Sequence, residues 1–379
     1  MTVLLVSNDF PPTVGGIQSY LRDFCTELVR RIDPEKLIVL TSIQNEAQAR
    51  AEDSQVPFRV VRRPEKTLLP TLAVRQHMQR LIRDHNVECV WFGAAAPLAL
   101  MGSAAREAGA RRVVASTHGH EVGWSMIPGA RQVLRRIGNS CDAITYISEY
   151  TLNRFRSAFG AHPNYVKLPS GVDCQFFRPA PPAEVESTRA RLGVGQAPLI
   201  VCASRLVPRK GQDTLIRTLG DVRAAVPDTR LVIVGSGPYE RTLRAMASGL
   251  SGAVSFTGRV SRTALRETIA AADVFAMPAR TRGAGLDVEG LGIVYLEAQA
   301  CGVPVIAGDS GGAPEAVGAG AGIVVAGRNT RAVEEGLISL LSNPRARAEM
   351  STTAREFVQE NYSWEELGDR LYWTLFPQG

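Results

Sequence analysis

The chain of 379 residues is 45% hydrophobic and 21% charged and contains no low-complexity tract. This excludes an intrinsically disordered protein, and the length predicts two or three domains, of which two large ones are the simplest arrangement. The formal net charge is +6, and residues 1–175 hold most of the excess, with 21 Lys and Arg against 16 Asp and Glu. That basic half forms either an ordinary solvated surface or a surface that favours anionic lipid. Neither half clusters basic with aromatic residues, so no nucleic-acid partner is expected.

The opening segment MTVLLVSNDF is predicted to be a first strand rather than a signal peptide, because Ser7, Asn8 and Asp9 interrupt its apolar run. No stretch of the sequence reaches the roughly 18 apolar residues that a membrane-spanning helix needs. The six cysteines are scattered singly, which indicates neither a zinc site nor a disulfide framework. We therefore expect a cytoplasmic protein.

Short β-branched runs alternate with amphipathic segments in the first half, beginning with TVLLVSN and GIQSYLRDFCTELVRR. Runs that are apolar on both faces belong in a parallel sheet covered by helices. The same rhythm restarts at Pro198 with PLIVCASRL and RLVIVGSG. We predict an α/β fold with two doubly wound, Rossmann-like domains at 1–175 and 198–360, a proline-rich linker at 176–197 and an amphipathic helix at 361–379.

Ligands of such sheets bind at the carboxyl ends of strands, so the loops there are the candidate sites. In the first half, Gly15 and Gly16 precede a predicted helix and either approach a phosphate or form a simple turn. The segment STHGHE places His118 and His120 beside Glu121. Further metal ligands have no obvious source, so a hydrogen-bonding role for His118 is favoured over a metal site.

In the second half, Arg205 and Lys210 flank the turn that follows the first strand-like run. A guanidinium and an ammonium at such a turn can hold a diphosphate, although exposed basic residues are often only solvated. The turn Gly235–Pro238 and the segment FTGRV either border a nucleotide base or close tight turns.

Two glutamates, Glu289 and Glu297, bracket an apolar segment. The glycines around position 290 place Glu289 in a loop, and Glu297 inside the helix that begins at Gly292 and Ile293. A helix N-terminus favours an anion, and carboxylates accept hydrogen bonds from hydroxyls. Glu289 as a helix cap and Glu297 as a satisfied buried acid are the alternatives for each residue alone, but the basic pair and glycine-rich loops together favour a sugar nucleotide.

These motifs resemble the GT-B glycosyltransferases of family GT4 over almost the whole chain. The resemblance rests on the E-x7-E spacing of Glu289 and Glu297, the SRL-x-x-x-KG turn, GSGP and the Gly15-Gly16 pair, in that family's order. It implies that Glu289 contacts the donor sugar, Glu297 the ribose, and that the helix 361–379 crosses back onto the first domain. The implied catalytic residues are His118, Arg205, Lys210 and Glu289. The implied donor-binding residues are Gly15, Gly16, Arg205, Lys210, Gly235, Gly237, Arg259, Val260, Glu289, Gly290, Leu291, Gly292, Ile293, Val294 and Glu297, and the acceptor-binding residues are Asp9, Gln18 and Tyr20.

A narrower resemblance involves the segments STHGHEVGWSM and MPARTRGAGLDVEGLG, the second of which forms a longer loop than in many GT4 members. Both are similar to actinobacterial GDP-mannose-dependent transferases that act on a phosphatidylinositol monomannoside. This implies retaining α-mannose transfer from GDP-mannose without a cofactor, and no metal requirement is expected because the sequence has no DxD triplet. Trp124, Met126 and Ile127, beside three arginines, either attach the protein peripherally to the inner leaflet of the plasma membrane or belong to an ordinary packed helix.

Three other functions remain open at this stage. They are a GT4 transferase with a UDP-sugar donor and a soluble acceptor, a GT-B epimerase, and a hinged two-domain protein that binds a sugar nucleotide without transferring it.

Overall fold

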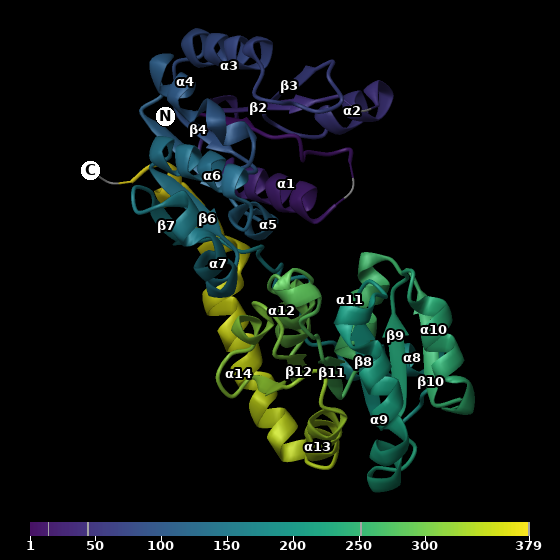
Figure 1. Ribbon diagram of the computed structural model, residues 1–379. Helices are drawn as coiled ribbons and strands as arrows, with labels where there is room; N and C mark the ends of the chain where they lie inside the picture. Colours follow the sequence, from purple (N-terminus) through teal and green to yellow (C-terminus); the bar gives the residue numbers. More distant parts are fainter. Residues whose placement is uncertain (14, 44, 251, 378–379) are drawn as a thin grey trace. The chain divides into compact units, whose positions relative to one another are not determined.

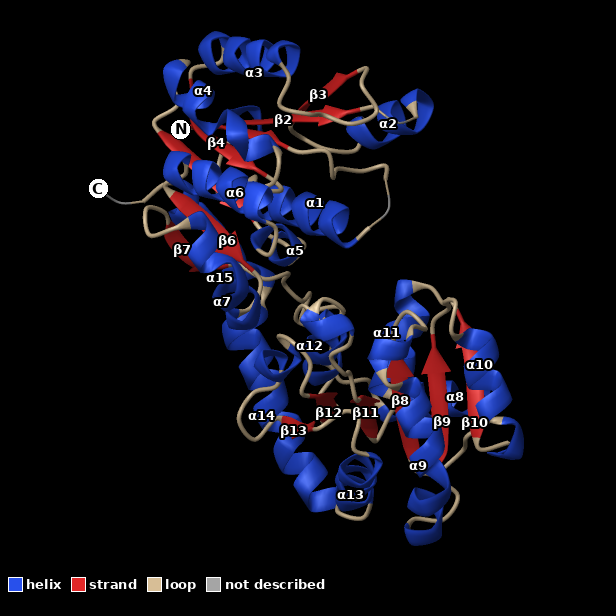
Figure 2. Cartoon of the chain, in the orientation of Figure 1, coloured by secondary structure: helices blue, strands red, loops and turns tan. Residues whose placement is uncertain are grey.

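The computed structural model describes residues 1–379 apart from 14, 44, 251 and 378–379. The chain forms two compact units, Met1–Ser170 with Trp364–Gly379, and Gly171–Ser363. Each unit is built on one parallel sheet with helices on its faces (Figures 1 and 2). The apolar runs of the sequence form the strands of both sheets, because strands covered on both faces gain from apolar residues at every position.

The sheet of the first unit has the order β3-β2-β1-β4-β5-β6-β7, and all of its ladders are parallel. Leu4 and Val6 of β1 face one core cluster, whereas Val3 and Leu5 face another on the opposite side. This alternation places β1 in the middle of the unit. The strands are β1 (Thr2–Val6), β2 (Leu37–Ser42), β3 (Arg59–Arg63), β4 (Val87–Phe92), β5 (Arg112–Ser116), β6 (Ala143–Tyr146) and β7 (Asn164–Lys167).

The helices of the first unit begin at recognisable capping residues in several cases. Thr71 accepts a hydrogen bond from the backbone N–H of Val74, and Ser148 accepts one from Thr151, so that α3 and α7 start there. The helices are α1 (Gly16–Leu28), α2 (Glu46–Asp53), α3 (Leu72–Asp84), α4 (Gly102–Glu107), α5 (Glu121–Ser125), α6 (Pro128–Ser140), α7 (Glu149–Phe159) and α15 (Trp364–Leu375), with short 3₁₀ turns at Pro34–Lys36 and Leu98–Met101.

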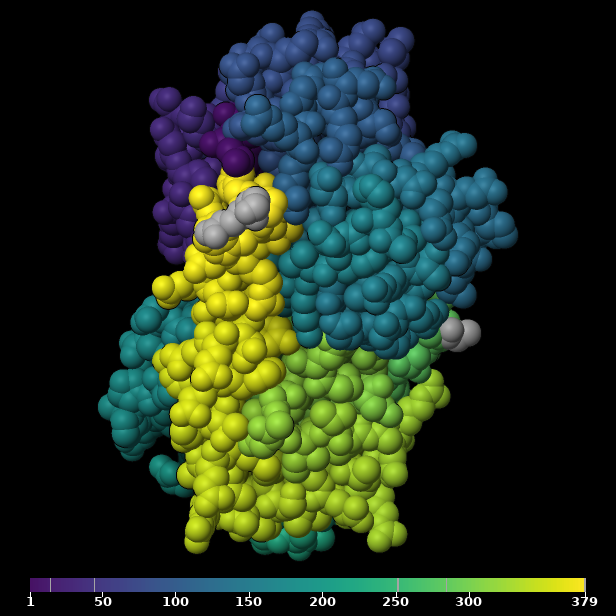
Figure 3. Space-filling model, turned by 90° about the vertical axis from the view of Figure 1, so that its left-hand side faces the viewer, coloured from purple at the N-terminus to yellow at the C-terminus, as the bar shows by residue number. Residues whose placement is uncertain are grey.

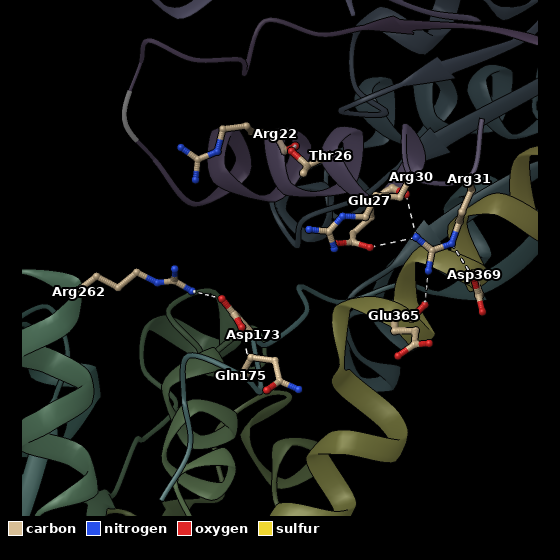
Figure 4. Close-up of polar contacts among 10 residues, drawn as sticks. All are labelled: Arg22, Thr26, Glu27, Arg30, Arg31, Asp173, Gln175, Arg262, Glu365 and Asp369. Carbon is tan, nitrogen blue, oxygen red and sulfur yellow. Dashed lines mark hydrogen bonds and ion pairs between the residues drawn. The ribbon is translucent and has the colours of Figure 1, made fainter. Parts of the chain in front are cut away.

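The terminal helix α15 packs on the first unit. Its buried face, Leu367, Leu371 and Leu375, lies in the same core cluster as α1. Figure 4 shows the polar edge of this contact, where Arg31, in the turn that follows α1, donates to a carboxylate oxygen of Asp369 at 2.6 Å and to the carbonyl oxygen of Glu365 at 2.7 Å. Two interactions therefore fix α15: the burial of its apolar face, and the hydrogen bonds from Arg31 to two of its residues.

The sheet of the second unit has the order β10-β9-β8-β11-β12-β13 and is also entirely parallel. Its strands are β8 (Leu199–Ala203), β9 (Arg230–Val234), β10 (Val254–Gly258), β11 (Val274–Met277), β12 (Val305–Gly308) and β13 (Gly322–Val325). Its helices are α8 (Pro182–Arg191), α9 (Gln212–Ala225), α10 (Glu240–Met246), α11 (Arg262–Ala270), α12 (Ile293–Ala300), α13 (Thr330–Leu341) and α14 (Pro344–Tyr362). Helix α14, yellow in Figure 3, packs against α12 and α13.

The bounds of the units differ from the predicted domain bounds. The segment 176–197, predicted to be a linker, contains helix α8 and belongs to the second unit. Arg189 of α8 donates to a carboxylate oxygen of Asp273 at 2.8 Å, which fastens the segment to the chain just before β11. The chain passes between the units at 170–171 and again at 363–364.

Candidate active site

The loops after β8, β9 and β10 meet helix α12 around a cavity of about 420 Å³ in the second unit. Arg205, Gly235, Arg259, Val260, Val294 and Glu297 were all predicted to bind the donor, and all line this cavity. Ser204, Ser236 and Leu265 also line it and were not predicted. A larger hollow of about 800 Å³ beside α7 in the first unit is lined by none of the predicted site residues.

Arg205 and Arg259 are exposed cations of this cavity. The backbone beneath Arg205 is fixed, because the side-chain amide of Gln212 donates to the Ser204 hydroxyl at 2.8 Å and to the Arg205 carbonyl at 3.2 Å. Nε of Arg259, on the loop after β10, donates to the hydroxyl of Ser236, on the loop after β9, at 3.1 Å. Two guanidinium groups therefore flank a cavity that also contains apolar wall residues, a combination suited to an anionic ligand with an organic base.

Lys210 and Glu289 form an ion pair, with Nζ 2.5 Å from Oε2 and side chains 11% and 10% exposed. Lys210 ends the 3₁₀ turn Pro208–Lys210, and Gly211 follows in the left-handed region with φ 79°. A Cβ at Gly211 would overlap the carbonyl oxygen of Pro278, so only glycine allows the turn to lie this close to the end of β11. The predicted diphosphate-binding lysine and sugar-binding glutamate are thus in direct contact.

The backbone of Glu289 is held by the loop after β12, which the sequence analysis did not identify. The N–H of Glu289 donates to the Ser310 hydroxyl at 3.3 Å, and its carbonyl accepts from the N–H of Gly312 at 2.9 Å. Gly311 has φ 59°, and a Cβ there would overlap the Glu289 carbonyl oxygen. The glycine pair after VPVIAG was the available sequence signal.

Gly311→Ala is expected to displace Glu289 and to lower kcat/KM by up to about 10²-fold, the scale associated with a displacement of about 1 Å at a catalytic group. Steady-state kinetics with the wild-type chain as reference measures this. Gly220→Ala is the matched control, because Gly220 lies within α9 and a Cβ there meets no atom within 4 Å. Kinetics of Gly311→Ala equal to those of Gly220→Ala would contradict the role given to this loop.

Glu297 lies on α12 and lines the cavity, whereas Lys210 and Glu289 are not among the residues that line it. Burial raises the pKa of its carboxyl to about 7, an effect that the nearby Arg262 partly opposes. The helix begins after Gly292, which has φ 87°. The side chain of Leu291 is buried in the hydrophobic core, so the predicted contact of Leu291 with the donor can be made only by its backbone.

The remaining predicted donor residues of the second unit are two loop glycines and Ile293. A Cβ at Gly237 would overlap the carbonyl oxygen of Leu206, so this glycine permits two loops to pack together. Gly290 lies in the loop that leads to α12, and Ile293 is the first residue of that helix and is partly exposed.

In the first unit, Gly16 begins α1 and Gly15 precedes it. Nε2 of Gln18 donates to Oδ1 of Asp9 at 3.0 Å. The structure therefore brings together two of the three predicted acceptor residues at the carboxyl end of β1, beside the glycine pair.

His118 follows β5, and its Nε2 lies 2.7 Å from the carbonyl oxygen of Gly93. Since a carbonyl only accepts, Nε2 carries the proton and Nδ1 is left as an acceptor. Burial lowers the pKa of the imidazole, which favours this neutral form. The carboxylate of Glu121 accepts hydrogen bonds from the N–H groups of His118 and Gly119, both at 3.1 Å, and orients the loop.

The structure corrects the prediction that the side chain of Tyr20 contacts the acceptor. It is 4% exposed, and its hydroxyl donates to the carbonyl oxygen of Leu168 at 2.8 Å. Its ring packs edge-on against the imidazole of His118 at 4.9 Å, so Tyr20 supports His118 instead. Within the described residues, no three His, Cys, Asp or Glu side chains are grouped so that they could hold a metal ion.

Comparison with known proteins decides the family. The model described as "Glycosyltransferase Family 4" matches residues 14–176, and that described as "Glycosyl transferases group 1" matches residues 185–357. A GDP-mannose-dependent monoacylated alpha-(1-6)-phosphatidylinositol monomannoside mannosyltransferase of Corynebacterium glutamicum is 56% identical over 97% of this chain and 96% of its own length. The chain belongs to glycosyltransferase family 4.

A second relative supports this family 4 assignment, and a solved structure supports the fold. The GDP-mannose-dependent alpha-(1-6)-phosphatidylinositol monomannoside mannosyltransferase of Mycolicibacterium smegmatis is 54% identical over 97% of each chain. The crystal structure of Anabaena Alr3699/HepE in complex with UDP matches 99% of each chain with a TM-score of 0.79 at 20% identity, which shows the fold alone. The predicted GT-B fold, with two Rossmann-like parallel sheets, is confirmed, and the protein is a glycosyltransferase.

Proposed function

We propose that this glycosyltransferase moves α-mannose, with retention of configuration, from GDP-mannose to a phosphatidylinositol monomannoside. The observation that carries the proposal is the identity of 56% and 54%, over 97% of this chain, to enzymes with that donor and acceptor in their names.

The donor is proposed to bind along the cavity of the second unit. Arg205 and Lys210 hold the diphosphate, because a guanidinium fork and an ammonium both match phosphate oxygens. Glu297 accepts hydrogen bonds from the ribose hydroxyls, and Glu289 accepts them from the mannose. The wall of Val260, Leu265 and Val294 provides apolar contact for the base.

The leaving diphosphate gains negative charge as the glycosidic bond breaks. Arg205 and Lys210 stabilise that charge from fixed positions, which is commonly the largest contribution to catalysis in such sites. Front-face substitution is proposed, in which the departing diphosphate helps to take the proton of the acceptor hydroxyl. His118 is neutral and presents Nδ1 as an acceptor for a hydroxyl of the sugar.

The donor and acceptor are tested together by incubating the protein with GDP-mannose or UDP-glucose, each with a phosphatidylinositol monomannoside or a free inositol phosphate. We expect product only from GDP-mannose with the lipid acceptor. Product from UDP-glucose and the soluble acceptor would support the runner-up, a UDP-sugar transferase. Nucleotide binding without any product would support a binding protein.

Metal is not expected to be required, because the sequence offers no DxD triplet to bridge a metal ion to the diphosphate. The transfer rate should therefore be unchanged after incubation with excess EDTA. A rate that falls in EDTA and returns with Mg²⁺ or Mn²⁺ would contradict this expectation.

Peripheral attachment to the inner leaflet is proposed for the first unit, since the acceptor is a lipid. Of the described helices, none is both long and apolar enough to cross a bilayer. Met126 and Ile127 are 54% and 60% exposed next to exposed arginines of α6, whereas Trp124 is partly buried against the core. Co-sedimentation with anionic vesicles should weaken as salt rises and in Ile127→Asp. Binding that neither change affects would contradict this surface.

A further inference from the structure

Two consecutive basic residues of the turn after β8 contact two acidic residues of the loop after β11. Lys210 pairs with Glu289, as described above, and Arg209 pairs with Asp287, with Nη1 3.2 Å from Oδ1. The carbonyl oxygen of Arg209 also accepts a hydrogen bond from the N–H of Arg280 at 2.8 Å. The turn and the loop are therefore joined by two parallel ion pairs and a backbone hydrogen bond.

The loop itself is a small hairpin. Arg282 and Asp287 exchange backbone hydrogen bonds of 2.9 and 3.2 Å, and Gly283 and Gly285, with φ 55° and 89°, form its tip. Its base is fixed by Arg280, which contacts Asp213 at 2.9 Å. Asp287 thus closes the hairpin. Because it lies two residues before Glu289, its position constrains the backbone position of this sugar-binding residue.

Donor binding is expected to weaken one of these ion pairs and to leave the other intact. On the proposed function, Lys210 turns to the diphosphate and Glu289 to the sugar, so their mutual contact weakens when the donor binds. The Arg209–Asp287 pair has no such competing partner in the proposed chemistry. Nε of Arg209 is buried and has no hydrogen-bond partner among the described residues, so Asp287 is the side chain that fixes the guanidinium.

We propose that Arg209 and Asp287 are positioning residues that hold the sugar-contacting loop on the diphosphate-binding turn while Lys210 and Glu289 engage the donor. The proposal rests on the proposed function of this site. The opposing interpretation is an ordinary surface pair of little consequence, since the side chains are 31% and 43% exposed.

Kinetics of Asp287→Asn and Arg209→Gln separate the two interpretations. We expect kcat to fall at least about tenfold while the donor KM changes less than about threefold, because the loop is misplaced only after the donor has bound. The share of GDP-mannose that is hydrolysed to GDP and mannose should rise. The double variant Arg209→Asp with Asp287→Arg restores the pair and should recover most of kcat.

The control is Glu335→Gln, which breaks an exposed arginine–carboxylate pair, with Arg331, within α13 of the same unit. Kinetics of Asp287→Asn equal to those of Glu335→Gln, or a charge-reversed double variant no better than the single variants, would overturn the proposal. The proposed function would fail differently, as absence of transfer by the wild-type chain.

Hydrogen exchange gives a readout that needs no turnover. With saturating GDP, which occupies Lys210 through its phosphates, the backbone amides of 282–290 should remain protected in the wild-type chain. In Asp287→Asn they should exchange at least about tenfold faster with GDP than without it. Equal protection in both chains would overturn the proposal even if the donor sugar were not mannose.

Discussion

Lys210→Ala and Glu289→Ala are each expected to lower kcat for transfer by about 10²–10³-fold, the usual effect of removing a group that stabilises developing charge. On the proposed function, Lys210 supplies the ammonium that meets the leaving diphosphate, and Glu289 fixes the sugar from which it departs. The measurement is single-turnover transfer at saturating GDP-mannose, which isolates the chemical step from product release.

Stability provides the control for these variants, because the pair is almost completely buried. Each single variant leaves an unpaired charge and should lose up to about 3–5 kcal/mol of unfolding free energy. The double variant Lys210→Ala with Glu289→Ala leaves neither charge, so it should be more stable than either single variant yet equally inactive. Activity near the wild-type value in a folded single variant would refute the site.

Glu297→Gln is expected to weaken GDP binding by at least about tenfold and to raise stability at alkaline pH. A neutral amide accepts fewer hydrogen bonds from the ribose than a carboxylate does, and each lost hydrogen bond to a charged group is worth about 1.5–3 kcal/mol. Calorimetric titration with GDP at pH 8 measures the first effect, and thermal unfolding at pH 5 and pH 8 measures the second.

The direction of the pH effect follows from the raised pKa of Glu297. The carboxyl titrates near 7 in the folded chain and near its ordinary value of 4.5 when unfolded. Between these values the unfolded chain binds fewer protons, so stability falls as pH rises, by up to about 3 kcal/mol at 1.36 kcal/mol per pKa unit, less what solvent screens. Glu297→Gln should therefore stabilise above pH 7 and be neutral below 4.5. A variant with an unchanged melting temperature at pH 8 would argue against the raised pKa.

The fold could be predicted from sequence because its signals are local. Strands covered on both faces appear as apolar runs, and β1, β4 and β8 are such runs almost from end to end. The segment 176–197 was mistaken for a linker because its prolines dominate the local pattern. What makes it part of the second unit is the contact of Arg189 with Asp273, 84 residues away, and sequence alone does not show such a contact.

Many of the residues that line the cavity were predicted from the sequence, but the direction of individual side chains was not. Charged residues and glycines at strand ends identified the cavity of the second unit, because ligands bind there in parallel sheets. Tyr20 was assigned to the acceptor because it lies near site residues in the sequence, but its side chain points into the core. The side chain of Leu291 is buried as well, which leaves only its backbone for the predicted donor contact. For Tyr20 the spacing to Phe24 and Leu28 on one helix face was the overlooked signal.

The most direct test of the proposed activity is the mass and anomeric configuration of the product formed from GDP-mannose and a phosphatidylinositol monomannoside. We expect one added hexose in an α linkage, formed by the wild-type chain and not by Lys210→Ala. A β-linked product, or an acceptor returned without added hexose, would contradict the proposed activity.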